Sequence, residues 1–226
     1  ILDLEDAVAP DVKPEARERV CAAASSGDYG LKEVTIRVNG LDTQWGADDI
    51  RAAAQAGPAA VVVPKINSAD DIHEIERQLE AGGAPDHTRI WAMLETPAGI
   101  FAAREIAAAS ERLTVLVMGT NDIAKELHAE QIAGRQPLQW SLGMCLMAAR
   151  LAGKVILDGV YNDVKDTEGF LAECTQGRQM GFDGKTLIHP GQVEGANTAF
   201  APSEQAVDDA RGLIGAWEDG AGSGVV

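Results

Sequence analysis

The sequence predicts an α/β protein of the (β/α)8 TIM-barrel type whose first strand precedes the chain. Short apolar runs alternate with Ala-rich, charge-dotted stretches that have a helical pattern, and seven such units can be counted. Alternating strands and helices indicate βαβ units and a parallel sheet. Residue 1 already lies inside a strand pattern, and seven units are one short of the eight in a barrel. A doubly wound open sheet is the structural alternative.

The predicted strands are the apolar runs Ile1–Glu5, Val34–Val38, Ala60–Lys65, Ile90–Glu95, Val115–Gly119, Val155–Tyr161 and Lys185–His189. The predicted helices between them are Pro14–Ala24, Ala47–Ala56, Ala69–Glu80, Gly99–Ala109, Leu138–Ala152 and Thr167–Met180. Ser68 precedes an acidic first turn, and Asp166 precedes Thr167 and Glu168, which are start signals for two of these helices. A last helix opens at Pro202. We therefore expect a single barrel domain over residues 1–219, including this C-terminal helix, and a loose tail at 220–226.

The composition excludes several classes of protein. The chain has 226 residues, of which 46% are hydrophobic, and a formal net charge of −16. Such an acidic chain has no surplus of basic residues to neutralise nucleic-acid or lipid phosphates, so we expect neither nucleic acid nor membrane as a partner. It contains no apolar run of about 18 residues, as a membrane-spanning helix would require. Its three cysteines are far apart and indicate reduced thiols, so we expect a cytoplasmic protein.

Charged residues recur at the predicted strand ends. Because side chains alternate faces along a strand, the polar residues oppose apolar ones there. If the apolar face meets the helices, the charged side chains point into the barrel near its carboxyl end, where active sites of this fold lie. The residues concerned are Asp3, Glu5, Arg37, Glu95 and Asp158. The alternative is a structural ion-pair network around Arg37, because buried charges require partners.

Two carboxylates on neighbouring strands indicate a metal site. Glu95 ends one strand, and Asp122 follows the next. Adjacent strands lie about 4.8 Å apart, so both side chains can reach one ion. Two carboxylates with the remaining positions left to water and substrate are what Mg²⁺ prefers. The alternatives are that Glu95 pairs with Arg37 and that Asp122 caps the helix beginning near Ile123.

Lys65 lies at the end of another predicted strand. A lysine there could form a Schiff base in an aldolase. With several acidic residues predicted nearby, we favour a charged lysine that forms a salt bridge.

The ordered set of motifs resembles the HpcH/HpaI aldolase and citrate lyase β-subunit superfamily, in particular its CoA-ester lyases. The resemblance spans nearly the whole chain, and its motifs occur in the family's order. The matching stretches are residues 2–8 (LDLEDAV), 36–39 (IRVN), 63–65 (VPK), 94–99 (LETPAG), 119–122 (GTND), 157–161 (LDGVY), 181–185 (GFDGK) and 188–190 (IHP).

The resemblance implies a TIM barrel with Mg²⁺ held by Glu95 and Asp122, and with Arg37 on the substrate's oxygens. Glu5 is assigned a catalytic role in orienting water around the metal. The predicted substrate-binding residues are Arg37, Asp6, Pro97 and Gly119. The implied partners are a CoA thioester, a small 2-oxo acid and further copies of the chain in a homotrimer or homohexamer.

The predicted reaction is a Mg²⁺-dependent carbon–carbon cleavage of a 3-hydroxyacyl-CoA of the malyl-CoA, methylmalyl-CoA, citramalyl-CoA or citryl-CoA type. Its products would be acetyl-CoA and a 2-oxo acid such as glyoxylate, pyruvate or oxaloacetate. Three alternatives stay open: a malyl-CoA thioesterase, a metal-dependent 2-oxo acid aldolase that does not use CoA, and a non-catalytic assembly subunit. The family's first strand and its C-terminal acidic lid have no counterpart in the sequence, so we expect a fragment of a longer protein.

Overall fold

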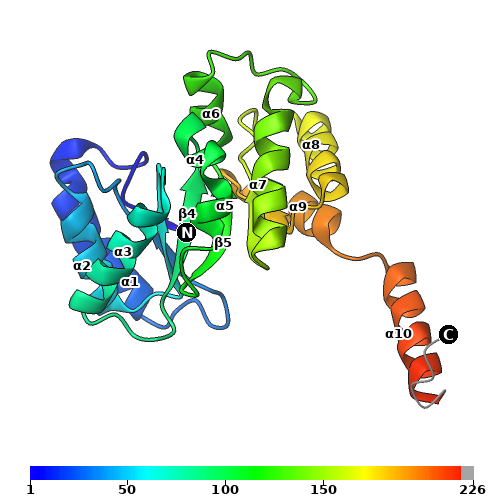
Figure 1. Cartoon of the computed structure of the whole chain (residues 1–226), viewed down its shortest axis with the longest axis horizontal. Helices are drawn as coiled ribbons and strands as arrows, with labels where there is room; N and C mark the ends of the chain where they lie inside the picture. Colours follow the sequence, from blue (N-terminus) through cyan, green and yellow to red (C-terminus); the bar gives the residue numbers. More distant parts are fainter. Residues whose placement is uncertain (220–226) are drawn as a thin grey trace.

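Seven parallel strands form one sheet in the order in which they occur along the chain (Figure 1). The computed structural model describes residues 1–219. The strands are β1 (Leu2–Asp3), β2 (Thr35–Arg37), β3 (Ala60–Val63), β4 (Arg89–Leu94), β5 (Leu113–Met118), β6 (Val155–Asp158) and β7 (Gly184–Lys185). Sequential order in a parallel sheet requires every connection to cross over in the same sense, which curves the sheet toward a barrel.

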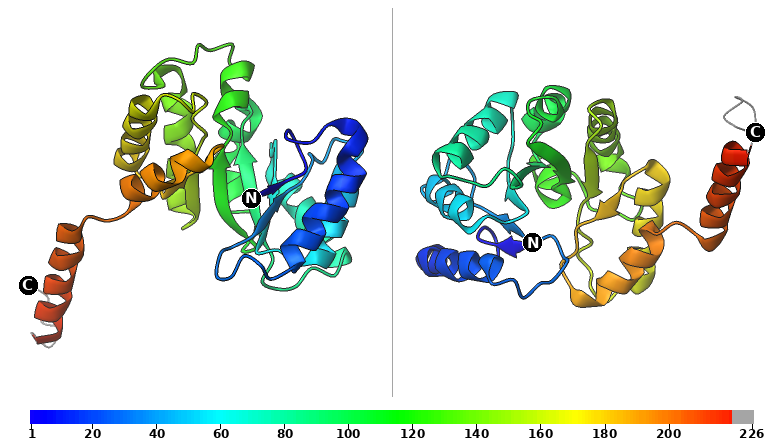
Figure 2. Two further views of the ribbon diagram at one scale, coloured as in Figure 1. Left: turned by 180° about the vertical axis from the view of Figure 1, so that it is seen from behind. Right: turned by 90° about the horizontal axis from the view of Figure 1, so that it is seen from below.

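The helices lie outside the curved sheet, as the view from below shows (Figure 2). They are α1 (Lys13–Ser25), α2 (Gly46–Ala56), α3 (Ala69–Ala81), α4 (Pro97–Phe101), α5 (Ala103–Ala107), α6 (Thr120–Glu126), α7 (Gln139–Leu151), α8 (Thr167–Met180), α9 (Val193–Phe200) and α10 (Glu204–Asp219). Short 3-10 helices are η1 (Pro10–Val12), η2 (Gln136–Leu138) and η3 (Pro190–Gln192). Within residues 1–219, β7 and β1 do not pair. The parallel α/β architecture is confirmed as a partial barrel, and its closure by an eighth strand stays a prediction.

The predicted elements occur in the structure in the predicted order, with several differences in extent. The predicted strands Ile1–Glu5 and Val155–Tyr161 are shortened to β1 and β6. The predicted strand at Lys185–His189 is only the two residues of β7, because His189 caps η3 and Pro190 begins it. The predicted helix Gly99–Ala109 is two helices, α4 and α5, separated at Ala102. Helix α9 was not predicted from the sequence. The predicted tail at 220–226 lies outside the described residues.

The core lies between the sheet and the surrounding helices. Strand β4 shows the alternation expected of a strand with helices on one side only. Ile90, Ala92 and Leu94 are buried, while Trp91 and Met93, which point to the other face, are half-buried. All four residues of β3 are buried, as are Leu113 and residues 115–118 of β5. These central strands fix the carboxyl ends at which charged side chains gather.

Local signals place the helix termini. Ser68 and Asp71 form a reciprocal capping box at the start of α3, in which each side chain accepts from the other residue's backbone N–H. The Asp166 carboxylate accepts from the N–H of Gly169 and caps α8. No described helix is long and apolar enough to cross a membrane. Cys21, Cys145 and Cys174 are free thiols, and burial raises the pKa of Cys145 to about 12.

Leu116→Ala tests the core beneath the strand ends. Leu116 is fully buried in the middle of β5. We expect the substitution to lower the free energy of unfolding by about 2–5 kcal/mol, because it removes buried methyl groups and leaves a cavity. Chemical denaturation measures this change. Leu31→Ala is the matched control, since Leu31 is fully exposed and its loss should leave stability almost unchanged. Equal losses for the two variants would contradict the position assigned to Leu116.

Candidate active site

The carboxyl ends of β1 to β5 carry most of the residues that the sequence predicted for the site. Glu5 follows β1, Arg37 ends β2, and Glu95 follows β4 directly. Gly119 separates β5 from α6, and Asp122 lies in the first turn of that helix. In a parallel sheet these ends share one edge, so the fold brings together residues that lie far apart in the sequence.

Arg37 is held by three acidic side chains from the β1 end. Its Nε and Nη2 donate to the two carboxylate oxygens of Asp3 at 2.7 and 2.6 Å, which is a bidentate pair. Its Nη1 lies 2.7 Å from Glu5 Oε2 and 3.8 Å from the exposed Asp6 carboxylate. The ion-pair network around Arg37 therefore exists, but Glu95, the partner considered for Arg37, does not belong to it.

The protonation states in this cluster follow from burial and from Arg37. Burial raises the pKa of Asp3, but hydrogen bonds from Arg37 and from the Glu5 backbone outweigh this effect, so the pKa is lowered. Burial also raises the pKa of Glu5, and there the neighbouring carboxylates of Asp6 and Asp3 reinforce it, so the pKa stays above its ordinary value. Burial alone would lower the pKa of Arg37, but Asp3 and Glu5 raise it. Arg37 is a permanent cation between an ionised Asp3 and a more basic Glu5.

Glu95 is the most strongly perturbed acid of the site. Its side chain is buried, with 3% of the residue exposed. Burial raises its pKa to about 7, and the carboxylates of Asp122 and Glu5 add to the increase. A hydrogen bond of 2.8 Å from the Lys65 backbone N–H to Oε1 opposes the increase. Within residues 1–219, Oε2 accepts no hydrogen bond, so one oxygen of a buried carboxylate is left for a ligand.

Gly119 leaves the room that Glu95 occupies. A Cβ atom at Gly119 would overlap the Glu95 carboxylate. Glycine is therefore required at this position because the Glu95 side chain approaches its backbone closely. The backbone conformation itself is not left-handed and would not require glycine. The sequence predicted Gly119 as a substrate-binding residue, and the structure shows a different contact: its missing side chain makes space for the predicted metal ligand.

Asp122 and Pro97 lie at helix starts. Asp122 makes no side-chain hydrogen bond within the described chain, and Gly119 is the N-cap of α6, so the alternative of a capping Asp122 is wrong. Pro97 is the first residue of α4, where its missing N–H costs nothing, and the Thr96 hydroxyl accepts from the Gly99 N–H. Pro97 thus directs the chain away from Glu95, and its predicted contact with substrate remains untested.

Two lysines act differently from the sequence interpretation. Lys65 forms no ion pair within residues 1–219, and it supports Glu95 through its backbone, which has a left-handed φ of 53°. Lys13, which the sequence pattern did not mark as part of the site, is buried. Its Nζ donates to the carbonyls of Leu4 and Glu5 at 2.8 and 2.9 Å and lies 5.1 Å from the centre of the Trp45 ring. Lys13 therefore fixes the backbone that carries Glu5.

Asp158 does not join the Arg37 cluster, which corrects the prediction of one inward-pointing set. It is fully buried and pairs with Arg135 Nη1 at 2.6 Å and with Lys185 Nζ at 3.1 Å. Glu173 of α8 completes this second network through Lys185, at 2.7 Å. The separation arises because basic partners close to Asp158 on β7 and on the loop before α7 compensate its charge. Arg135 has a left-handed φ of 51° and lies outside the regular helices and strands, so no sequence pattern indicated that it would pair with Asp158.

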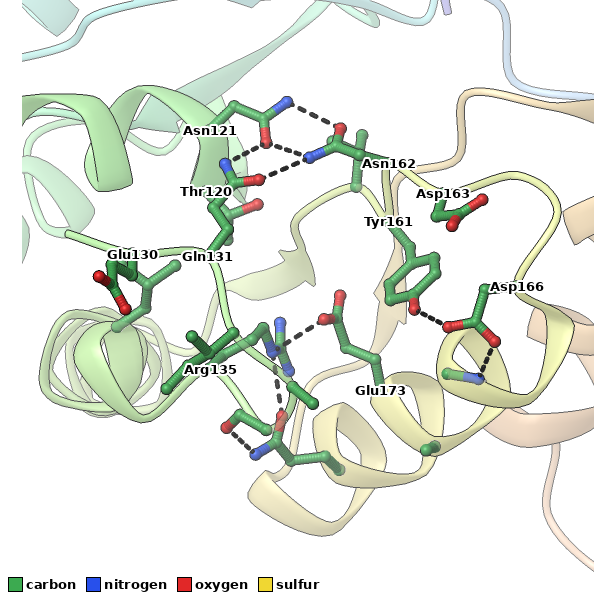
Figure 3. A pocket seen from close by; sticks show the side chains of 18 residues that line it. Thr120, Asn121, Glu130, Gln131, Arg135, Tyr161, Asn162, Asp163, Asp166 and Glu173 are labelled. Carbon is green, nitrogen blue, oxygen red and sulfur yellow. Dashed lines mark hydrogen bonds and ion pairs between the residues drawn. The ribbon is translucent and has the colours of Figure 1, made fainter.

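A cavity of about 410 Å³ opens beside the start of α6 (Figure 3). One wall carries the hydrogen-bonded amides of Asn121, Gln131 and Asn162. On the other wall, the Tyr161 hydroxyl donates to Asp166 Oδ2 at 2.6 Å, and this bond raises the pKa of the phenol to about 12. The cavity is thus lined both by amides and by charged side chains, among them Arg135, Asp166 and Glu173, and it borders the helix that carries Asp122.

The residues at the β4 and β5 ends fit a hard divalent cation. The carboxyl ends of β1 to β5 carry five carboxylates (Asp3, Glu5, Asp6, Glu95 and Asp122), against the cations Arg37 and Lys65. Of the other four carboxylates, Asp122 and Glu5 lie close enough to raise the pKa of Glu95. No cluster of three or more His, Cys, Asp or Glu side chains that could hold a metal occurs in the described chain. Protein ligation by Glu95 and Asp122 alone would leave further positions to water or substrate, as Mg²⁺ prefers.

Comparison with known proteins shows the family. A model of the HpcH/HpaI aldolase/citrate lyase family matches residues 1–190. The chain belongs to this family of enzymes. The match includes every predicted site residue, from Glu5 to Asp122.

Three curated relatives align with almost the whole of this chain. A (3S)-malyl-CoA thioesterase from Cereibacter sphaeroides is 48% identical over 97% of this chain and 74% of its own length. The citrate lyase subunit beta of Escherichia coli is 37% identical over 100% of this chain and 76% of its own. An L-malyl-CoA/beta-methylmalyl-CoA lyase from Rhodobacter capsulatus is 34% identical over 99% and 79%. Relatives of this family member therefore include enzymes named for two different reactions.

Solved structures agree with the fold. The protein CitE from Mycobacterium tuberculosis, in complex with magnesium, acetoacetate and coenzyme A, aligns with a TM-score of 0.76 at 29% identity. The alignment covers 96% of this chain and 78% of that one. CitE in complex with magnesium and pyruvate aligns with a TM-score of 0.74 at 28% identity, over 95% of this chain and 87% of that one. The family therefore contains structures that hold magnesium together with small oxo acids.

The raised pKa of Glu95 predicts a pH-dependent stability. Between its ordinary pKa of 4.5 and about 7, folded Glu95 keeps a proton that the unfolded chain releases, so stability falls as pH rises through this window. We expect Glu95→Gln to flatten this slope in EDTA. Because Mg²⁺ binds the deprotonated carboxylate, it should raise the melting temperature more at about pH 8 than at about pH 6. Thermal denaturation measures both effects.

Asp70→Asn, at an exposed acid, is the control and should keep the wild-type slope of stability against pH. An unchanged slope in Glu95→Gln would refute the assignment of the raised pKa to Glu95.

Gly119→Ala changes no charge, yet it should weaken metal binding. The new Cβ would displace the Glu95 carboxylate, so we expect the affinity for Mg²⁺ to fall about 10-fold or more. Titration calorimetry with MgCl₂ measures it. Gly143→Ala on α7 is the matched control, because a Cβ there meets no other atom. Wild-type affinity in Gly119→Ala would show that the position of Glu95 does not matter for the metal.

Proposed function

We propose that this protein is a Mg²⁺-dependent enzyme acting on a short 3-hydroxyacyl-CoA of the malyl-CoA type. The observation that carries the proposal is the buried Glu95 carboxylate, raised in pKa beside Asp122 and Glu5, with one oxygen left unbonded. An acidic site of this kind repels an anionic substrate unless a cation is bound. The relatives named for malyl-CoA and the CitE complexes with magnesium support the same substrate class and metal.

Glu95 and Asp122 would hold the metal. Bound Mg²⁺ would supply Lewis-acid polarisation of a substrate oxygen. Gly119 provides the space for Glu95, and the Lys65 backbone N–H fixes its Oε1. The protein's own contribution is therefore a pre-positioned pair of carboxylates whose negative charge is only partly compensated.

Arg37 supplies a fixed positive charge at the β2 end, where it pairs with Glu5, a carboxylate that also acts on Glu95. Asp3 fixes the guanidinium plane through two hydrogen bonds, and Glu5 holds Nη1. Each terminal nitrogen carries two N–H groups, so Arg37 retains donors for a substrate carboxylate or carbonyl oxygen. Glu5, with its raised pKa, holds a proton more readily than an ordinary carboxylate.

Thioester hydrolysis is the first candidate reaction. Water adds to the thioester carbonyl, the C–S bond breaks, and the thiol of coenzyme A leaves with a proton. The products would be free coenzyme A and a hydroxy acid such as malate. The 48% identity to (3S)-malyl-CoA thioesterase over 97% of the chain favours this reaction.

Carbon–carbon cleavage is the second candidate, because the malyl-CoA lyase relative covers 99% of the chain. The C3 hydroxyl loses its proton, the bond between C2 and C3 breaks, and C2 takes a proton to give acetyl-CoA and glyoxylate. Arg37 would then face the oxygen that changes charge. The two reactions start from the same substrate and differ in the bond that breaks.

Product identification decides between the candidates. We expect the protein to consume malyl-CoA with Mg²⁺ and not with EDTA. Malate with free coenzyme A in the mass spectrum would establish the thioesterase, and acetyl-CoA with glyoxylate the lyase. Turnover of free hydroxy acids alone would indicate an aldolase that does not use CoA. Absence of all turnover would favour the non-catalytic assembly subunit and would refute the proposed function.

Glu95→Gln and Asp122→Asn test the site that carries the proposal. Each should lower kcat/KM by at least about 10²-fold, because each removes a ligand charge while keeping the side-chain shape. Arg37→Lys should lower it as well, since lysine cannot keep the bidentate pair with Asp3. Steady-state kinetics with saturating Mg²⁺ measure these losses. Asp70→Asn is the matched control and should keep wild-type activity, whereas full activity in Glu95→Gln would contradict the proposed metal site.

A further inference from the structure

Lys65 has a strained backbone conformation at the carboxyl end of β3. Its φ of 53° lies in the left-handed region, which side chains other than those of asparagine and aspartate rarely adopt. Glycine would adopt this conformation without strain. Lys65 is one of three residues other than glycine that have a positive φ within residues 1–219. Strain of this kind persists only where the surrounding structure enforces it, and it is concentrated at functional sites.

The turn that follows β3 is fixed by its neighbours. The Lys65 backbone N–H donates to Glu95 Oε1 at 2.8 Å, and the Ile66 N–H donates to the Met93 carbonyl at 3.2 Å. The start of α4 also packs closely on this turn, because a Cβ atom at Gly99 would overlap the Ile66 carbonyl. These contacts involve the backbone of the turn and hold it for any residue at position 65. They therefore do not explain why a lysine stands there.

The Lys65 side chain is exposed and forms no ion pair within residues 1–219. Its charge nevertheless reaches the candidate site. Burial raises the pKa of Glu5 and that of Glu95, and the positive charge of Lys65 opposes the increase in both. Arg37, by contrast, is already paired with carboxylates from the β1 end. Of these two cations, Lys65 is the one whose charge is not engaged by an acidic side chain of the described chain.

We propose that the Lys65 ammonium group binds an anionic oxygen of the substrate. The inference rests on the proposed function and deepens it, because a substrate of the malyl-CoA type carries anionic oxygens on two parts. These are the carboxylate of the acyl group and the phosphates of coenzyme A. A lysine suits either group, since its ammonium is a compact charge on a flexible stem. This role differs from both earlier interpretations of Lys65, the Schiff base and the salt bridge.

Substitution of Lys65 should affect the binding of Mg²⁺ and of an anion differently. Lys65→Asn removes the ammonium group, keeps the backbone N–H that supports Glu95, and places there a residue that tolerates the left-handed conformation. Loss of a nearby positive charge should leave the affinity for Mg²⁺ unchanged or raise it. The affinity for the anion should fall by about 10- to 100-fold, as expected for a lost charge-assisted hydrogen bond. If Lys65 served only to position Glu95, binding of Mg²⁺ would weaken instead.

Titration calorimetry measures both affinities without depending on turnover. MgCl₂ is titrated first, and malate, coenzyme A and pantetheine are then titrated separately at saturating Mg²⁺. Weaker binding of malate to Lys65→Asn would assign the acyl carboxylate. Weaker binding of coenzyme A, with binding of uncharged pantetheine unchanged, would assign the phosphates. Lys65→Arg keeps the charge and should retain most of the affinity. Lys32→Asn is the matched control, because Lys32 is exposed and precedes β2, at the opposite end of the strands.

Four results would overturn the assignment of Lys65. They are unchanged binding of malate and coenzyme A in Lys65→Asn, weaker binding of Mg²⁺ in that variant, a loss in Lys65→Arg as large as in Lys65→Asn, and no binding of either anion by the wild-type protein. Failure of the proposed function is a different result. A wild-type protein that shows the expected Lys65-dependent binding but does not consume malyl-CoA would refute the proposed function and leave the assignment of Lys65 standing.

Discussion

The buried carboxylate of Glu95 is the constraint on which the site depends. A charged oxygen removed from water is costly unless donors or a cation compensate it. Within residues 1–219 only one donor reaches Glu95, the Lys65 backbone N–H, and Asp122 and Glu5 lie close enough to raise the pKa further. Gly119 must lack a side chain for this arrangement to exist at all. This uncompensated negative charge at the strand ends supports the proposed cation site, and it lowers the stability of the protein without a cation.

The second charged network shows what a structural solution looks like in the same fold. Asp158 is even more buried than Glu95, yet Arg135 and Lys185 pair with it and Glu173 balances the additional positive charge. Two cations and two carboxylates compensate one another there. Around Glu95 and Arg37 five carboxylates meet two cations. Compensation of charge, more than burial, distinguishes the candidate active site from the network that stabilises β6, β7 and α8.

The sequence predicted the strands and most of the helices because apolar runs and start signals are local. It also placed Glu95, Asp122 and Arg37 at one edge, since parallel strands share their carboxyl ends. It did not reveal that the charges divide into two networks. Arg135 lies on an irregular loop and Lys13 bonds backbone carbonyls, so neither residue belongs to a charge pattern that the sequence shows. The role of Gly119 was also hidden, since close approach between a glycine and a side chain on another strand leaves no trace in either local pattern.

In the proposed site, metal and proton would compete for Glu95, and this competition would link stability to function. With a pKa of about 7, the carboxyl group is half-protonated near neutral pH when no cation is bound, which relieves the repulsion from Asp122 and Glu5. A divalent cation removes that proton and replaces it with two positive charges. It also turns a site that repels anions into one that can attract a substrate carboxylate, next to the fixed charge of Arg37. In the proposed function, the excess of carboxylates at the strand ends would therefore make binding of an anionic substrate conditional on prior binding of the metal.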